Sequence, residues 1–182
     1  MEVSLDQPAL VARAREGAPA AWEALYRHLY PRLLAYAERR LDREAARDAV
    51  SEAMARAVAR IKRFVWNGAG FDAWVFAILR HVVIDAQRTA AIRAHTGAGE
   101  PDEAPSSAPG PLDCLLGAEA STAVRAAFEQ LAPCDREMLE LRVVAGLSSD
   151  EVAAVVGKRP GTVRMAQARA LERLRELLEE RT

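Results

Sequence analysis

The sequence predicts an all-α protein made of two small helical domains joined by a flexible linker. Apolar residues recur at spacings of three and four along most of the chain, which is the period of one buried helix face. The composition agrees, because 51% of the residues are hydrophobic and only 5% are aromatic. Between residues 94 and 117 this pattern stops, and Pro, Gly, Ser and four acidic residues replace it. We therefore place the domains at residues 1–93 and 118–182.

Helix start signals occur at three places in the first domain. Ser4 and Gln7 form a capping-box pattern, a second helix starts near Ala20 and continues past Pro31, and Asp42 is placed to cap a third. The apolar stripe of the third helix is predicted to contain Ala49, Val50, Ala53, Met54, Ala57, Val58 and Ile61.

A loop with two glycines, residues 64–70, interrupts the helical pattern before a long apolar helix begins at Phe71. Aromatic residues in such a helix belong to the core by default. We expect one face to contain Phe71, Trp74, Val75, Ile78, Leu79, Val82 and Val83.

A short helix, a tight turn and a basic helix follow one another in the second domain. Ser148 and Glu151 form a capping box, Gly157 ends the short helix, and Pro160 suits the first turn of the next. Residues 158–175 contain six basic residues and one acidic residue, although the whole chain carries a net charge of −1. Positive charge gathered on one helix attracts phosphate. This pattern predicts a helix-turn-helix whose second helix enters the major groove, and a solvated basic helix is the alternative.

Several classes of function are disfavoured. No apolar run approaches the ~20 residues of a membrane-spanning helix. Cys114 and Cys134 are too few for a disulfide scaffold and have no zinc-site spacing. His28, His81 and His95 lie far apart, with no nucleophile or carboxylate at a recognisable catalytic spacing. We expect a cytoplasmic protein, not an enzyme, with no metal, cofactor, membrane or small-molecule substrate.

Short motifs in both domains follow the order seen in one known family. Those in the second domain are Leu131-Ala-Pro, Asp135-Arg136-Glu137, Leu141-Arg142, Gly146-Leu147-Ser148, Glu151-Val152-Ala153, Gly161-Thr162-Val163-Arg164, Arg169-Ala170 and Leu174-Arg175. Those in the first domain are Arg47-Asp48-Ala49-Val50 and the series Phe71, Trp74, Ile78, Arg80, Val82, Ile84, Asp85 and Arg88. The chain resembles bacterial sigma factors of the sigma-70 family, in particular the extracytoplasmic-function group, over roughly residues 20–178.

The resemblance implies a sigma domain two at residues 1–93 and a sigma domain four at residues 118–182. Such a protein binds core RNA polymerase, directs it to promoter DNA and is controlled by an anti-sigma factor. The implied contacts to the upstream promoter element are Lys158, Arg159, Thr162, Arg164, Met165, Ala168, Arg169 and Arg173. Those that recognise and melt the downstream element are Trp66, Asn67, Phe71, Trp74, Arg80, His81, Gln87 and Arg88. Those that bind polymerase are Asp48, Val50, Ser51, Met54 and Val58.

The downstream residue types suit strand separation. A protein that opens a duplex without a nucleotide motor must bind the unpaired strand better than the paired one, which aromatic platforms and a positive track achieve. Trp66, Asn67 and Phe71 are the candidates for a base pocket. The candidates for the strand track are Arg80, Gln87 and Arg88.

The alternative function is a sigma mimic, an adapter that captures an anti-sigma factor without touching DNA. Such a mimic has little reason to keep a basic recognition helix. Met165, Ala166 and Ala168 replace residues that are often more polar or bulkier in the family, so we expect a different upstream sequence preference.

Overall fold

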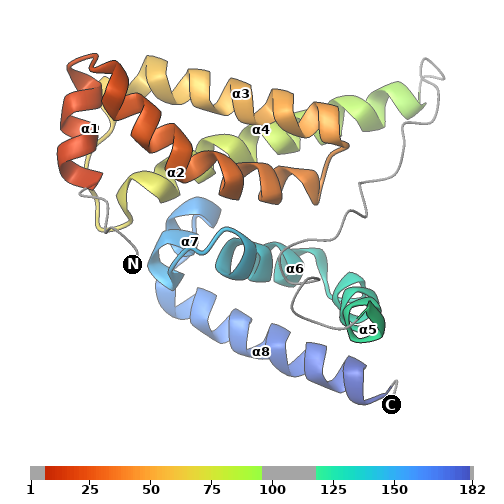
Figure 1. Cartoon of the computed structure of the whole chain (residues 1–182). Helices are drawn as coiled ribbons and strands as arrows, with labels where there is room; N and C mark the ends of the chain where they lie inside the picture. The colour runs from red at the N-terminus through yellow and green to blue at the C-terminus, as the bar shows by residue number, and fades with distance from the viewer. Residues whose placement is uncertain (1–6, 96–117, 181–182) are drawn as a thin grey trace. The chain divides into compact units, whose positions relative to one another are not determined.

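A computed structural model describes residues 7–95 and 118–180, and these residues form helices and no strand. The chain divides into two compact units, Met1–Ser106 and Ser107–Thr182 (Figure 1). The prediction of an all-α protein with two helical domains is confirmed. The cap expected at Ser4, and the expected linker from residue 96 onward, lie outside the described residues.

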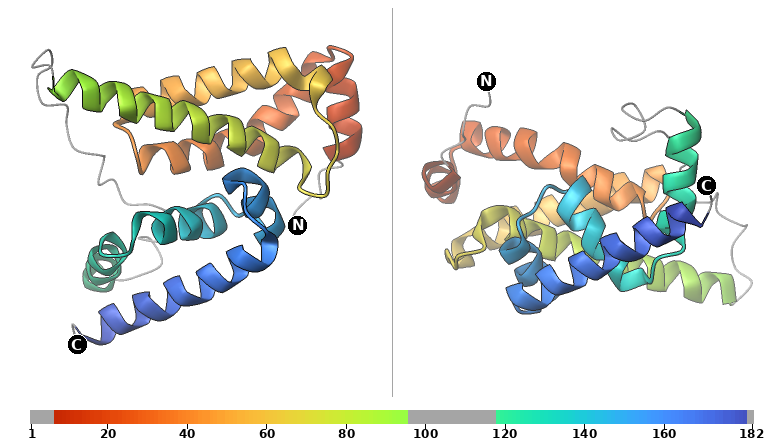
Figure 2. Two further views of the ribbon diagram at one scale, coloured as in Figure 1. Left: turned by 180° about the vertical axis from the view of Figure 1, so that it is seen from behind. Right: turned by 90° about the horizontal axis from the view of Figure 1, so that it is seen from below.

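The amino-terminal unit consists of α1 (Gln7–Arg15), α2 (Pro19–Glu38), α3 (Arg43–Arg60), the short 3-10 helix η1 (Ile61–Arg63) and α4 (Gly70–His95). α3 packs along α4 and α2, and α1 packs on α2 (Figures 1 and 2). As predicted, α2 continues through Pro31. Asp42 caps α3, because its carboxylate accepts a hydrogen bond from the Ala45 amide at 2.8 Å.

The core of this unit follows the predicted stripes with two corrections. Val58 was expected in the buried stripe of α3, but it is 50% exposed. Phe76 was missing from the expected face of α4, yet it is completely buried, and its ring meets the edge of the Tyr36 ring at 6.0 Å. The reason is that α4 packs against both α2 and α3, so its buried surface is wider than a single stripe.

A buried carboxylate, Asp72, joins the first turn of α4 to α1 and α2. Asp72 is only 6% exposed. Its Oδ1 accepts a hydrogen bond from Gln7 Nε2 at 2.6 Å, and its Oδ2 lies 2.9 Å from His28 Nε2 and pairs with the Arg32 guanidinium. The partners are 40 to 65 residues from Asp72 in sequence, so no local spacing indicated this cluster. The cluster fixes the start of α4, directly after the glycine loop.

The carboxy-terminal unit consists of α5 (Ala118–Glu129), α6 (Pro133–Leu139), the π-helical segment η2 (Glu140–Val144), α7 (Ser149–Val156) and α8 (Pro160–Glu179). α8 contacts α5, α6 and α7, with α7 near its amino end and α5 near its carboxyl end (Figure 2). A buried core cluster contains Ala127, Leu131, Leu139, Ala170 and Leu177. α8 is therefore a core element of this unit as well as its longest helix.

Asp72→Asn should lower the free energy of unfolding of the amino-terminal unit by ~1–3 kcal/mol, because it removes the buried negative charge that pairs with the partly buried Arg32 guanidinium. Tryptophan fluorescence during urea unfolding measures this unit selectively, since all three tryptophans, Trp22, Trp66 and Trp74, belong to it. Asp85→Asn is the matched control, because Asp85 is an exposed aspartate on the same helix. Equal midpoints for the two variants would contradict a stabilising role for the cluster.

Candidate nucleic-acid interface

The turn between α7 and α8 has the geometry that the sequence predicted. The Glu151 amide donates to Ser148 Oγ at 3.2 Å, and the Ser148 amide donates to Glu151 Oε2 at 2.6 Å, which completes the capping box. Gly157 ends α7 with φ +69°, a left-handed conformation that side chains other than glycine rarely adopt. Pro160 then occupies the first turn of α8. The predicted helix-turn-helix is confirmed at each of these positions.

α8 divides into a buried side and an exposed side. Val163, Ala166, Ala170 and Leu177 are buried against the rest of the unit. The eight residues predicted to contact the upstream element are all exposed: Lys158, Arg159, Thr162, Arg164, Met165, Ala168, Arg169 and Arg173. The packing thus leaves every one of them accessible to a ligand.

Positive charge is concentrated on the amino-terminal half of α8 and on the turn before it. In the carboxyl half of α8, the arginines form ion pairs with glutamates of the same helix: Arg173 lies 2.8 Å from Glu176, and Arg175 lies 3.8 Å from Glu172. The hydrogen bond with Glu176 raises the pKa of Arg173. Residues 158–180 contain six basic and four acidic residues, so the excess of bases counted for residues 158–175 falls when the last turn is included. Arg173 is therefore the least available of the predicted contacts.

Arg142 holds α8 in place from the π-helical segment. Its Nε donates to Gln167 Oε1 on α8 at 3.0 Å, and its Nη1 donates to the Leu147 carbonyl oxygen in the loop before α7. π-helical turns are rare and direct side chains differently from an α-helix. Arg142 thereby connects the segment before the motif to the recognition helix. The sequence analysis identified the Leu141-Arg142 motif but did not predict the contact of Arg142 with α8.

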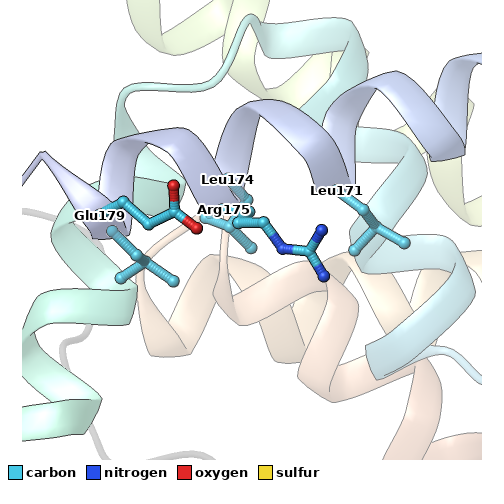
Figure 3. A pocket seen from close by; sticks show the side chains of 5 residues that line it. Leu171, Leu174, Arg175 and Glu179 are labelled. Atoms are coloured by element: carbon cyan, nitrogen blue, oxygen red, sulfur yellow. The ribbon is translucent and has the colours of Figure 1, made fainter.

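Near the carboxyl end of α8, the side chains form an open recess lined by Leu171, Leu174, Arg175, Leu178 and Glu179 (Figure 3). Leu174 and Leu178 pack against the core cluster of the unit. The recess is therefore the outer edge of the core. It lies on the half of α8 where the arginines form ion pairs with glutamates.

In the amino-terminal unit, Phe64 is the centre of an aromatic cluster beside the loop 64–70. Phe64 is buried, and its ring centroid lies 5.1 Å from that of Trp66, 5.4 Å from that of Phe71 and 5.2 Å from that of Trp74. Trp66 is 42% exposed, and Asn67 is exposed beside it. The loop therefore exposes one indole and one amide to solvent, and buried aromatic side chains pack beneath them.

Phe71 is completely buried. It was a candidate for the base pocket, but in this structure its ring supports Phe64 and Trp74 rather than facing solvent. Trp74 is half-buried in the same cluster. The accessible part of the predicted pocket is reduced to Trp66 and Asn67.

The predicted strand track, Arg80, Gln87 and Arg88, lies along α4, and the predicted contact His81 lies on the same helix. His81 and Arg88 are exposed, and Arg80 is half-buried. His81 Nδ1 lies 2.6 Å from the Ala77 carbonyl oxygen one turn earlier, which leaves Nε2 available to a ligand. Gln87 is exposed, and its Nε2 donates to the Arg40 carbonyl oxygen at 3.4 Å. These side chains lie on the helix that begins directly after the loop.

The residues predicted to bind polymerase separate into two groups. Asp48, Ser51 and Val58 are exposed and share one face of α3, at spacings of three and seven. Val50 is completely buried and Met54 is 6% exposed, so neither is accessible for docking. Both belong to the stripe that packs α3 into the unit, and Asp48, Ser51 and Val58 are the exposed part of the predicted polymerase-binding set.

Within residues 7–95 and 118–180, no three His, Cys, Asp or Glu side chains come together as a metal site. No helix in this part of the chain is long and apolar enough to cross a membrane. Cys134 is a free, exposed thiol.

Comparison with known proteins identifies the two units separately. Residues 25–92 match the family described as Sigma-70 region 2, and residues 121–174 match the family described as Sigma-70, region 4. The chain is also similar to the ECF RNA polymerase sigma factor ShbA of Streptomyces griseus, with 38% identity over 184 residues, 94% of this chain and 95% of that protein. SigD of Mycobacterium tuberculosis, also an ECF RNA polymerase sigma factor, is 39% identical over 117 residues, 64% of this chain and 55% of SigD.

A solved structure has the same fold. The sigma factor RpoE of Bartonella quintana, in complex with the anti-sigma factor NepR, superimposes with a TM-score of 0.67 at 26% identity, covering 86% of this chain and 96% of that one. Two region matches in this order, together with a relative aligned over almost its whole length, show that this chain belongs to the ECF group of RNA polymerase sigma factors.

Proposed function

We propose that this ECF sigma factor binds core RNA polymerase and directs it to promoters through two DNA contacts on separate units. The observation that carries the proposal is the exposed basic face on the amino-terminal half of α8, which the helix-turn-helix holds outward. Lys158, Arg159, Arg164 and Arg169 supply the attraction for phosphate. Because recognition helices contact base edges near their amino ends, Arg164 is the side chain placed to select sequence.

The second contact is the loop 64–70. A base that leaves the stack needs an aromatic surface and a polar partner, and the exposed Trp66 and Asn67 offer both. Arg88 and His81 on α4 would then follow the strand that leaves this pocket. The buried aromatic cluster and the Asp72 cluster keep the loop in place while it captures the base.

We assign the docking of core polymerase to the face of α3 that contains Asp48, Ser51 and Val58. Val58 is 50% exposed, which makes it the apolar centre of that face. An anti-sigma factor is a further proposed partner, because RpoE of Bartonella quintana forms a complex with the anti-sigma factor NepR. In this account the protein acts in the cytoplasm and is not itself a catalyst, since phosphodiester synthesis belongs to the polymerase.

Replacing Arg164 tests the upstream contact. Arg164→Ala should cost ~1–3 kcal/mol of promoter discrimination, because a bidentate base contact is lost, and the cost should depend on the upstream sequence. Transcription by the reconstituted holoenzyme from a set of promoters with substituted upstream elements measures it. Arg175→Ala removes the same charge from the other half of α8 and should leave discrimination unchanged. A uniform loss across all promoters would make Arg164 a phosphate contact instead.

Replacing Trp66 tests the downstream contact. Trp66→Ala should weaken opening of the downstream element by ~1–3 kcal/mol, the range for loss of one base–aromatic stack, and should leave upstream binding intact. Permanganate reactivity of unpaired thymines reports the opening. Tyr26→Ala is the matched control, because Tyr26 is an equally exposed aromatic residue, 43% against 42%, on α2. Equal opening by the two variants would remove Trp66 from the proposed pocket.

A further inference from the structure

One basic side chain on the proposed DNA-binding face of α8 forms an ion pair with an acidic side chain on the neighbouring helix. Arg164 Nη1 lies 3.6 Å from Asp150 Oδ1 in the first turn of α7. Lys158, Arg159 and Arg169 make no ion pair with any residue that the structure describes. The residue best placed to select sequence is thus the one whose charge is shared with an acid.

Asp150 takes no part in the capping box of α7. The first turn of α7 has two acids, and Glu151 is committed to the capping box, where its carboxylate accepts from the Ser148 amide at 2.6 Å. The Asp150 side chain is 66% exposed, and it forms an ion pair with Arg164. The charge of Asp150 can therefore be removed while the cap of α7 stays intact.

The position of Asp150 brings it close to DNA. In helix-turn-helix complexes the first helix crosses the phosphate backbone while the second enters the major groove. A carboxylate on the first turn of α7 that reaches Arg164 then lies between α8 and the backbone. It repels phosphate on any DNA, and it competes with phosphate for the Arg164 guanidinium.

We propose that Asp150 is a specificity-determining residue for recognition of the upstream element, a role that rests on the function proposed above. On unmatched DNA, Arg164 gains only a phosphate contact and must give up Asp150 to make it, so net binding is small. On a matched element, the guanidinium makes a bidentate contact with a base edge through two of its donors and keeps Asp150 on a third, so the ion pair is not given up. Asp150 thereby lowers affinity for DNA in general more than affinity for the matched sequence.

The test compares Asp150→Asn with Glu172→Gln. Both changes remove one exposed negative charge that lies 3.6–3.8 Å from an arginine of α8, and only the first affects Arg164. Holoenzyme assembled from the full chain is titrated with a matched promoter and with the same promoter carrying a substituted upstream element. The readout is the apparent Kd for the substituted promoter divided by the apparent Kd for the matched promoter. The contribution of core polymerase cancels in this ratio.

Asp150→Asn should tighten binding to the substituted promoter by up to about fivefold, the factor that corresponds to ~1 kcal/mol for an exposed pair, and should reduce the Kd ratio to a similar extent. The slope of log affinity against log salt on that promoter should steepen by about 0.9, as expected for one additional phosphate contact. Glu172→Gln should leave the ratio unchanged. Equal ratios for the two variants would overturn the proposal.

Arg164→Ala separates this inference from the function on which it rests. If Arg164→Ala alone leaves the Kd ratio at the wild-type value, the proposed upstream contact is wrong. If Arg164→Ala lowers the ratio, adding Asp150→Asn to it should change nothing further, because the pair no longer exists. A further fall of the ratio in the double variant would show that Asp150 acts without Arg164, and would overturn the pairing.

Discussion

Burial of one side of α8 is the interaction on which the carboxy-terminal unit depends. Val163, Ala166 and Ala170 face the core, and they fix the rotation of the helix about its own axis. That rotation decides which side chains face outward, so Arg164 and Arg169 are exposed as a consequence of packing. The left-handed turn at Gly157 then fixes the angle between α7 and α8. The proposed base-selecting surface is thereby positioned by small apolar contacts on the opposite side of the same helix.

In the amino-terminal unit, too, buried residues support a small number of exposed ones. Phe64 and Phe71 are buried and support the loop from below, while Trp66 beside them is partly exposed. Asp72 follows in the first turn of α4 and ties that turn to α1 and α2. A loop anchored at this end is organised before any ligand binds, and preorganisation would lower the cost of the base capture proposed for it. Buried residues in both units thus position a few exposed ones.

Local signals in the sequence predicted much of this architecture, because caps and turns depend on neighbouring residues. Ser148 and Glu151 act within one helical turn of each other, and Gly157 acts on the turn that it ends, so their roles were visible in the sequence. Contacts between distant segments were not visible, as the Asp72 cluster and the pair between Asp150 and Arg164 show. Val50, Met54 and Phe71 were predicted both as core residues and as contacts. Their burial favours the core role, since the apolar stripe of a packed helix faces inward.

Transcription by purified core RNA polymerase with this protein, from a library of randomised promoter fragments, tests whether the protein selects promoters through both units. Two DNA-contacting units on one chain predict initiation that requires the protein and that selects two separate sequence elements. The spacing between those elements should vary little, because both units are bound to the same polymerase. Initiation that selects a single element, or no initiation that depends on the protein, would contradict the account.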